Sequence, residues 1–465
     1  MSEQTTPAAS VTVEQHGIDH VPENARYGHP RNQFTIRFSP VIYLAGIFVG
    51  ATGGAFGLGI WGSITAIVVG NLLGSIATGL CALMGPKMGM PQLPMGRAAF
   101  GYHGNYMPSF LTLIVYVGYY TVGTVLGAKS LADLFGTSYK PMVVVVAALS
   151  VVIGIYGYQM LHVFGRWITY ISIVVLAVVS FYMFAHGAGP GANSTLDGSA
   201  FVTMWMLQFT VTFGYTVSWG PYASDYSRYL PRKTSSLSVF SWATSGLFAA
   251  TTWMMVLGAA LISLNPAGDV IDAFAIALPE WLRYTVLLVL GLSAIPHNSV
   301  NLYSGAMATL TCDLRARQSW IVTICGVFGG ILALAIGGSS FEDHFSSFLH
   351  VISYYIMPWL AILAIAYFKI YRNGDAFPRF SEFYKPDGVF KGIIWPGMGA
   401  FIVGVVVSIP FMANDYFTGP IGEYLNGADL SYFVSGALAA ILFSLTGRPV
   451  RSTSDDVEPV TEDEP

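Results

Sequence analysis

The sequence has 465 residues, of which 54% are hydrophobic and only 10% are charged. Soluble globular domains carry about 25% charged residues, so this composition excludes a soluble fold and indicates a chain that crosses a membrane many times. The net charge of −4 comes largely from acidic residues after Gly447, which predict a solvated, disordered tail and say nothing about a charged partner.

Twelve apolar segments are long enough to be membrane-spanning helices, each of which needs about 20 mainly apolar residues. We therefore expect an all-α polytopic membrane protein with helices at 40–62, 64–85, 106–135, 141–161, 166–186, 200–222, 238–264, 284–311, 319–338, 348–371, 393–412 and 430–447. The first 38 residues lack the apolar stretch of a signal peptide. The chain then divides into a cytoplasmic N-terminal segment (1–38), a ten-helix core (39–372), a loop (373–392), two further helices (393–447) and the tail (448–465).

The distribution of Lys and Arg predicts the orientation of the chain. An even number of crossings places both termini on one side, and short cytoplasmic loops retain positive charge. With the termini inside, 18 of the 21 Lys and Arg residues lie at inner ends, and only Lys129, Lys140 and Arg283 lie at or near the outer face. We therefore predict a cytoplasmic-membrane protein with both termini in the cytoplasm.

The first and sixth segments contain helix-weakening residues. Segment 1 holds a dense run of glycines around Thr52, and segment 6 holds Gly214, Gly220 and Pro221. Interrupted helices at matching positions in two halves are typical of transporters built from inverted repeats, where the break forms the binding site. We expect segment 1 to unwind at Gly50–Gly54, so that the backbone of Gly50, Ala51 and Thr52 contacts a ligand. The alternative is that these glycines only allow close helix packing.

Aromatic and amide side chains lie in the segments that would face such a site. Tyr119 and Gly123 are in segment 3, and Tyr215 is in segment 6. An aromatic face beside a glycine gap suits a flat ring. Asn298 and Asn301 share one face of segment 8, and amides offer both the donors and the acceptor that the edge of a neutral heterocycle needs. Packing and interhelical hydrogen bonding are the alternative roles.

Ionisable groups in or beside the spans are candidates for coupling and gating. His297 is able to titrate in the physiological range, although a histidine in a helix is more often neutral and hydrogen-bonded. Asp225 and Arg228, at the inner end of segment 6, predict a structural ion pair or gate latch. The three cysteines have no paired spacing, and the spans hold neither His-x-x-x-His nor paired carboxylates, so we expect no disulfide, metal, cofactor or enzyme activity.

Several stretches together resemble the purine and cytosine permease branch of the nucleobase:cation symporter-1 family. They are Val-Glu-Gln-His-Gly-Ile-Asp (13–19), Gly-Pro-Lys-Met-Gly-Met-Pro-Gln (85–92), Arg-Ala-Ala-Phe-Gly (97–101), Ala-Ser-Asp-Tyr-Ser-Arg-Tyr (223–229) and Asn-Leu-Tyr-Ser (301–304). The resemblance implies a LeuT-like core of two inverted five-helix repeats, with segments 1 and 6 broken, and two additional C-terminal helices. It also implies that segments 1, 3, 6 and 8 hold the substrate.

The resemblance implies roles for individual residues. Tyr119 is similar to the stacking residue of segment 3, and Tyr215 to the aromatic residue of segment 6. His297 and Asn298 fall where fungal carriers have an asparagine pair, so the histidine is a departure. Gly123 falls where hydantoin carriers have a glutamine, which argues against hydantoins.

Sodium-coupled relatives place a Ser-Thr pair early in segment 8, and this chain has Ile295 and Pro296 there, with Ser293 close by. We therefore expect coupling to H⁺ rather than Na⁺, through His297 with Ser293 as a second candidate.

The sequence thus predicts an importer of a neutral nucleobase, cytosine or a purine such as adenine, guanine or hypoxanthine, by alternating access. Tyr119 and Tyr215 would sandwich the ring, and His297, Asn298 and Asn301 would read its edge. Pyridoxine, thiamine, allantoin and uracil are alternative substrates, and a passive channel or a membrane-embedded enzyme are alternatives of another class. We expect a monomeric unit in a lipid bilayer, with no nucleic-acid partner.

Overall fold

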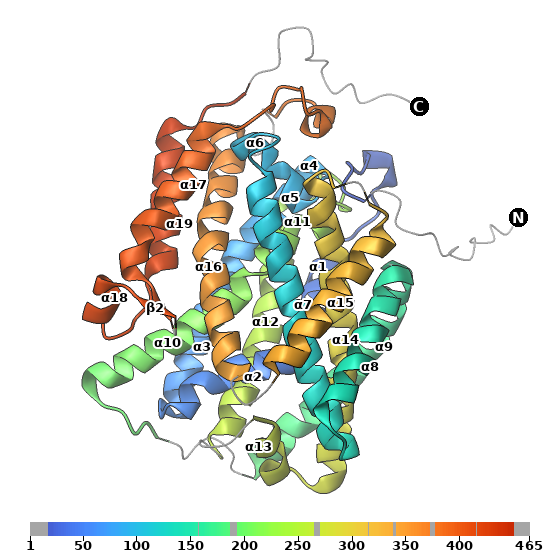
Figure 1. Ribbon diagram of the computed structural model, residues 1–465, viewed down its shortest axis with the longest axis vertical. Coiled ribbons are helices and arrows are strands. Elements are labelled where there is room, and N and C mark those ends of the chain that lie inside the picture. The colour runs from blue at the N-terminus through green and yellow to red at the C-terminus, as the bar shows by residue number, and fades with distance from the viewer. Residues whose placement is uncertain are drawn as a thin grey trace, which may run out of the picture.

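The computed structural model describes residues 17–156, 158–186, 193–264, 270–314, 316–337, 341–372, 377–414 and 416–450. These residues form helices almost throughout (Figure 1). The α-helices are α1 (Asn32–Phe38), α2 (Leu44–Ala55), α3 (Gly59–Ala82), α4 (Met84–Met88), α5 (Gln92–Met95), α6 (Arg97–Phe100), α7 (Tyr106–Phe135), α8 (Tyr139–Tyr156), α9 (Tyr158–Ala185), α10 (Gly198–Val217), α11 (Ala223–Ser227), α12 (Ser236–Ile262), α13 (Val270–Ala277), α14 (Glu280–Thr311), α15 (Gln318–Ile336), α16 (Phe341–Ile365), α17 (Trp395–Ser408), α18 (Pro420–Tyr424) and α19 (Ser431–Thr446).

Short elements connect them. The 3-10 turns are η1 (Glu23–Ala25), η2 (Ser39–Val41), η3 (Gly220–Tyr222), η6 (Phe380–Tyr384) and η7 (Ile409–Phe411), and a π-helical turn, η4 (Ala366–Ile370), continues α16. Strands β1 (Ala413–Asn414) and β2 (Phe417–Thr418) form a two-stranded antiparallel hairpin, with Ala413 opposite Thr418.

The predicted segments correspond to helices in the described residues. Among the residues described here, seven helices are long and apolar enough to span a membrane, and the bent pair Asn32–Val41 and Leu44–Ala55 makes an eighth if it is one span. Three shorter apolar helices, α8, α17 and α19, and the interrupted pair α10 and α11 occupy the other predicted segments. Apolar side chains face outward from the bundle, as at Phe181 (74% exposed) and Phe184 (77% exposed) on α9, which suits hydrocarbon rather than water. The number of crossings stays a prediction.

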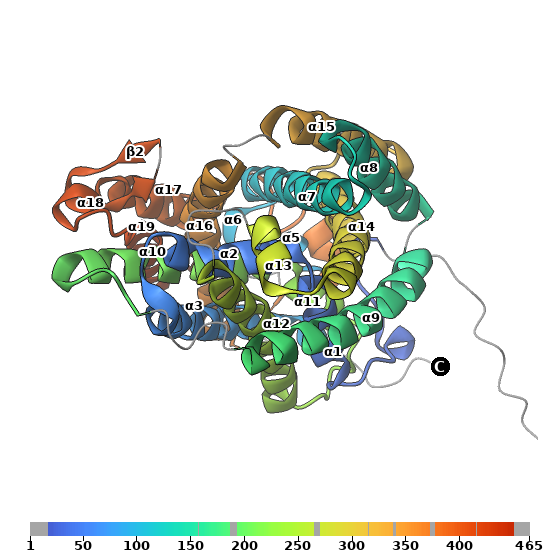
Figure 2. The same cartoon turned by 90° about the horizontal axis from the view of Figure 1, so that it is seen from below.

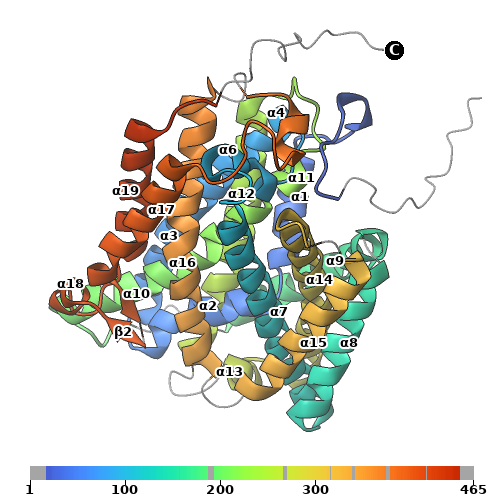
Figure 3. The same ribbon diagram turned by 45° about the horizontal axis from the view of Figure 1, so that its top comes forward.

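Eight of the helices pack as two groups of four. In one group α2, α3, α10 and α12 pack together, and in the other α7, α8, α14 and α15 do. Seen from below, α13 lies across the end of the bundle, between α7, α14 and α12 (Figure 2). The pair α17 and α19 packs on α16 at the edge of the molecule (Figure 3).

The predicted position of the first break is wrong. Residues 50–54 lie within the regular helix α2, and the chain bends by 67° before them, between η2 and α2. Helix formation therefore starts at Asn32, inside the segment predicted as N-terminal. The α2–α3 turn accounts for two of the glycines, since Gly57 and Gly59 have φ of +84° and +75°, which side chains rarely adopt.

Gly50 serves close packing rather than unwinding. A Cβ added there would lie 1.9 Å from the backbone oxygen of Met255 on α12. The alternative role of these glycines, close approach of helices, therefore applies at this position.

We expect Gly50→Ala to destabilise the protein by about 1–3 kcal/mol, because the methyl group forces α2 away from α12. Gly399→Ala on α17 is the matched control, since nothing lies within 4 Å of a Cβ there. Thermal unfolding of purified protein in detergent measures the difference. Equal melting temperatures for the two variants would contradict the packing role.

Candidate substrate-binding site

The first helix breaks where it passes the middle of α14. Pro40 lies in η2, and after it Ile42 (φ −77°, ψ 70°) and Tyr43 (φ −151°, ψ 174°) leave the helical conformation. The Pro40 carbonyl thereby loses its helical partner, and at bilayer depth such a group needs another one. Nδ1 of His297 on α14 supplies it, at 3.0 Å.

The sixth helix breaks at the same level. Helix α10 ends at Val217, η3 carries Pro221, and α11 resumes at Ala223. This agrees with the break expected at Gly220 and Pro221. The hydroxyl of Tyr222, in η3, donates to Oδ1 of Asn301 on α14 at 2.6 Å. Helix α14 therefore contacts both breaks through side chains that are one turn apart.

These contacts form one continuous chain of hydrogen bonds. The amide nitrogen of Asn301 lies 3.0 Å from Nε2 of His297 and also donates to the backbone oxygen of residue 297, at 3.0 Å. His297 and Asn301 are 4% and 1% exposed. The sequence predicted both residues in the site, and the structure brings them together with Tyr222, which it did not predict.

Asn298 presents a buried acceptor without a partner. Its amide nitrogen donates to Oγ1 of Thr124 on α7 at 3.0 Å, whereas Oδ1 has no hydrogen bond within the described residues. This oxygen lies over Gly123, where an added Cβ would be only 2.0 Å away. An unsatisfied buried carbonyl costs about 1–3 kcal/mol, so this oxygen is a candidate for a ligand's N–H donor.

Aromatic rings surround this level of the protein. Tyr119 donates to or accepts from Ser218 at the sixth-helix break, with 2.7 Å between the hydroxyl oxygens. Its ring is perpendicular to that of Tyr215, with an interplanar angle of 82° and a centroid distance of 6.2 Å. The two rings therefore meet edge to face. The predicted sandwich of a substrate's ring between them stays a prediction.

Tyr43 is a site residue that the sequence did not predict. Its ring stacks on the imidazole of His297, with centroids 3.8 Å apart and planes 21° apart. The hydroxyls of Tyr43 and Tyr215 interact across the gap between the first and sixth helices, and neither makes a hydrogen bond of normal geometry among the described residues. The signal in the sequence is Pro40, which precedes Tyr43 by three residues, whereas the glycine run predicted a break further along the chain.

Three predicted residues lie outside this cluster. Gly50, Ala51 and Thr52 are helical residues of α2. The helix there is tied to α10 by Gln208, whose Oε1 accepts from the amide of Gly53 at 2.6 Å and whose Nε2 donates to the Val49 oxygen at 2.9 Å. The predicted unwound backbone at these residues is therefore replaced by a cross-link between two regular helices.

The candidate cation residue Ser293 is buried and bonded within its own helix. Its hydroxyl donates to the backbone oxygen of Leu290 at 2.8 Å. Among the described residues, no group of three His, Cys, Asp or Glu side chains is placed to hold a metal ion.

The residues predicted as a gate lie at the end of the bundle where the N-terminal segment packs. Oδ1 of Asp225 accepts from the backbone N–H of Gln92 at 2.9 Å. The Arg228 guanidinium donates to the backbone oxygens of Gly17 (2.9 Å) and Asp19 (3.3 Å). Arg228 thus holds the N-terminal segment against α11.

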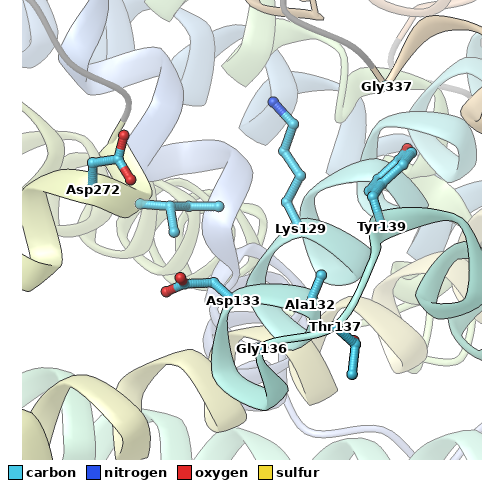
Figure 4. Close-up of a pocket in the computed structure, with 9 residues that line it drawn as sticks. Lys129, Ala132, Asp133, Gly136, Thr137, Tyr139, Asp272 and Gly337 are labelled. Atoms are coloured by element: carbon cyan, nitrogen blue, oxygen red, sulfur yellow. The ribbon is translucent and has the colours of Figure 1, made fainter.

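The opposite end of the bundle holds an open cavity of about 420 Å³ (Figure 4). It is lined by the end of α7, by α13 and by the residues next to α8 and α15. Lys129 and Asp272 approach it from α7 and α13, and Asp133 on its wall pairs with Arg283 at 2.6 Å. Lys129 is ten residues beyond Tyr119, so the cavity lies roughly 15 Å along α7 from the polar cluster.

Two broken helices that meet at buried polar groups, in a bundle of apolar helices, define a multi-pass membrane transporter. Residues 20–435 match the family model described as permease for cytosine/purines, uracil, thiamine and allantoin, so the chain belongs to this family. It is a transporter and not an enzyme.

Two relatives and one solved structure show the range of the similarity. The chain is 25% identical to the purine-cytosine permease FCY2 of Saccharomyces cerevisiae, covering 94% of this chain and 86% of that protein. It is 24% identical to the vitamin B6 transporter TPN1 of the same yeast, covering 93% and 86%. The closed, bromovinylhydantoin-bound structure of Mhp1, a nucleobase-cation-symport-1 family transporter, superposes with a TM-score of 0.74 at 17% identity, over 93% of this chain and 95% of Mhp1. The predicted family and LeuT-like fold class are thereby confirmed.

We expect Asn298→Ala to weaken substrate binding about 10- to 100-fold while leaving folded protein in the membrane, because one buried acceptor is lost. Ser299→Ala is the matched control, since that hydroxyl points away from the site and donates to the Ser150 oxygen on α8. Equilibrium binding of a labelled base to purified protein measures both variants. Normal binding by Asn298→Ala would place the substrate elsewhere.

Proposed function

We propose that this protein imports a neutral nucleobase, cytosine or a purine, across the cytoplasmic membrane by proton symport. The observation that carries the proposal is the buried Oδ1 of Asn298 above Gly123, which has no hydrogen-bond partner in the described part of the chain and lies at the level where both helices break. This oxygen would accept from a ring N–H or an exocyclic amino group, and the aromatic rings of Tyr43, Tyr119 and Tyr215 would contact the ring.

The charge of the site supports a neutral substrate. The described residues at the two breaks and on the facing turn of α14, namely 40–43, 215–222 and 297–301, include no carboxylate, lysine or arginine. A cationic ligand such as thiamine would need a counter-charge at this depth, because an unpaired charge in a low-dielectric site is costly. The amides of Asn298 and Asn301 instead suit neutral polar edges.

The surroundings of α14 support proton rather than sodium coupling. A sodium site needs several hard oxygen ligands. Ile295, at one of the positions where sodium-coupled relatives carry hydroxyls, packs into an apolar cluster with Leu131 and Val146. Pro296, at the other position, lies beside Gly165 of α9. His297 bonds the Pro40 oxygen at the first break and contacts Asn301, which bonds Tyr222 at the sixth. Its imidazole, unlike the neighbouring phenols, titrates near physiological pH, so it is the proposed carrier of the proton.

The contacts at the two ends support an orientation with both termini inside. The N-terminal segment is held by Tyr384, whose hydroxyl donates to the Ile18 oxygen, and the amide of Val450 donates to Tyr371, so both described chain ends lie at the arginine-rich end. That end is closed by Arg97, which is 1% exposed and donates to the Phe383 and Thr311 oxygens. The cavity of Figure 4 would then face outward as the entrance.

A second candidate substrate is pyridoxine, which the vitamin B6 transporter relative supports. It is a neutral ring of similar size, and it presents hydroxyl donors instead of ring N–H groups. Competition against a transported base separates the two.

We expect proteoliposomes with an inward proton gradient to accumulate labelled cytosine, and unlabelled adenine or hypoxanthine to compete more strongly than pyridoxine, allantoin or uracil. The reason is that each of these bases presents an N–H donor on a flat ring to the Asn298 amide oxygen, whereas pyridoxine presents hydroxyl donors. Stronger competition by pyridoxine would assign the transporter to vitamin B6. Accumulation driven only by sodium would contradict proton coupling.

We expect His297→Gln to abolish proton-driven accumulation but to retain exchange of labelled for unlabelled base across the membrane. Glutamine keeps hydrogen-bonding capacity but does not titrate, so it separates binding from coupling. The two assays use the same proteoliposomes with and without the gradient. Unchanged accumulation in this variant would remove His297 from the coupling step.

A further inference from the structure

We propose that His297, Asn301 and Tyr222 form a proton-controlled link between the two broken helices, in which protonation of His297 reverses or releases the hydrogen bond from Asn301 to Tyr222. This inference rests on the proposed function, since it describes how the proton carried by His297 would act on the sixth helix. Asn301 and Tyr222 are positioning residues in this scheme.

The direction of every hydrogen bond in the link is fixed by two backbone carbonyls. A carbonyl oxygen only accepts. The oxygen of residue 297 accepts from the Asn301 side chain, so the NH₂ group of Asn301 faces His297 and its Oδ1 faces Tyr222. The same NH₂ group lies 3.0 Å from Nε2 of His297, so Nε2 must accept. The Pro40 oxygen accepts from Nδ1, which therefore carries the proton of a neutral ring.

A second proton on the ring conflicts with this arrangement. An imidazolium donates from both nitrogens, so Nε2–H would face the donor group of Asn301 at a distance suited to a hydrogen bond. The conflict is relieved if the Asn301 amide turns over. The Asn301 oxygen then accepts from Nε2–H, but it also faces the backbone oxygen of residue 297, which is another acceptor. The NH₂ group of Asn301 faces the Tyr222 hydroxyl, which must change from donor to acceptor. The alternative, rotation of the imidazole, breaks the bond to Pro40 on the first helix.

With a neutral His297 ring, hydrogen bonds connect α14 to Pro40 at the first break and to Tyr222 at the sixth break. With a protonated ring, only one of these two connections is unchanged. Tyr222 is held in place independently of its hydroxyl, because its ring contacts Tyr116 at 4.6 Å and Trp219 at 5.1 Å between centroids. A change in the hydrogen bond at its hydroxyl is therefore a change in the attachment of η3 to α14, and not in the packing of the ring.

Other titratable groups near His297 do not compete for this role. From the first helix the neighbour is the Tyr43 ring, and from the sixth helix Trp219 and, through Asn301, Tyr222. Position 123 of α7 is a glycine, and Pro296 separates this turn of α14 from Gly165 of α9. Within the described residues, no carboxylate or cation acts on the His297 ring. Phenols ionise far above physiological pH, so the imidazole is the group that titrates.

The test follows the titration of His297 in full-length protein labelled with ¹³C-histidine and held in lipid nanodiscs. Its signal is assigned by its loss in His297→Gln, and ring-carbon shifts report the tautomer. We expect the neutral ring to carry its proton on Nδ1. We expect Tyr222→Phe to raise the titration midpoint by about 0.5–1 pH unit, because the hydrogen bond that Tyr222 donates to Asn301, which favours the neutral ring, is lost.

Two further variants complete the test. Asn301→Asp places an acceptor-only group beside Nε2 of His297. We therefore expect the titration midpoint of His297 to rise by about 1–3 pH units, more than in Tyr222→Phe. Tyr120→Phe is the matched control, because the Tyr120 hydroxyl is also buried but lies 3.4 Å from the Ala147 oxygen on α8, outside the link. Its midpoint should equal that of the wild type. If Tyr222→Phe does not fold, the His297 midpoint in Asn301→Asp still tests the link.

A neutral ring protonated on Nε2, or equal midpoints for Tyr222→Phe and Tyr120→Phe, would overturn the link. The proposed function stands in that case, provided that His297→Gln still loses proton-driven accumulation of labelled cytosine. If His297→Gln keeps that accumulation, the coupling part of the proposed function fails and the inference fails with it. The two failures are therefore distinguishable by separate measurements.

Discussion

The structure depends on how two interrupted helices satisfy their backbone inside a bilayer. A carbonyl released from a helical ladder has no water to bind in hydrocarbon, so it must find a protein partner. At the first break that partner is His297, which contacts the Pro40 oxygen with one ring nitrogen and Asn301 with the other. At the sixth break the contact runs through Tyr222 and Asn301. One turn of α14 therefore sets the relative position of both broken helices.

Contacts on both sides of this junction hold the helix halves in place. On the cavity side, Gln208 cross-links α2 and α10, so the halves of the two broken helices on that side form one unit. On the opposite side, Arg228 ties α11 to the N-terminal segment. Each half is therefore bound to a different set of neighbours.

The C-terminal helices brace the core rather than line the site. The Tyr432 hydroxyl of α19 donates to Thr210 of α10 at 2.7 Å. Asp429, which is 2% exposed, accepts from the Tyr354 hydroxyl of α16 and from the amides of Ala413 and Ser431. A buried carboxylate with this many donors is well satisfied, so it fixes α19 against α16. These contacts give segments 11 and 12 a structural role that hydropathy alone did not suggest.

The sequence by itself determined the class of the protein, because the length of each apolar run and the scarcity of charge decide what a bilayer accepts. It also indicated His297, Asn298 and Asn301, since polar groups in an apolar helix are costly without a partner. Only the tertiary structure decided which of these groups meet. The glycine run at 50–54 predicted unwinding, but glycine equally permits close helix packing. At Gly50 the packing role applies, because the backbone of Met255, on a helix far along the chain, lies directly against it. Likewise, the stacking of Tyr43 on His297 and the edge-to-face contact of Tyr119 with Tyr215 depend on how helices cross, which local sequence does not encode.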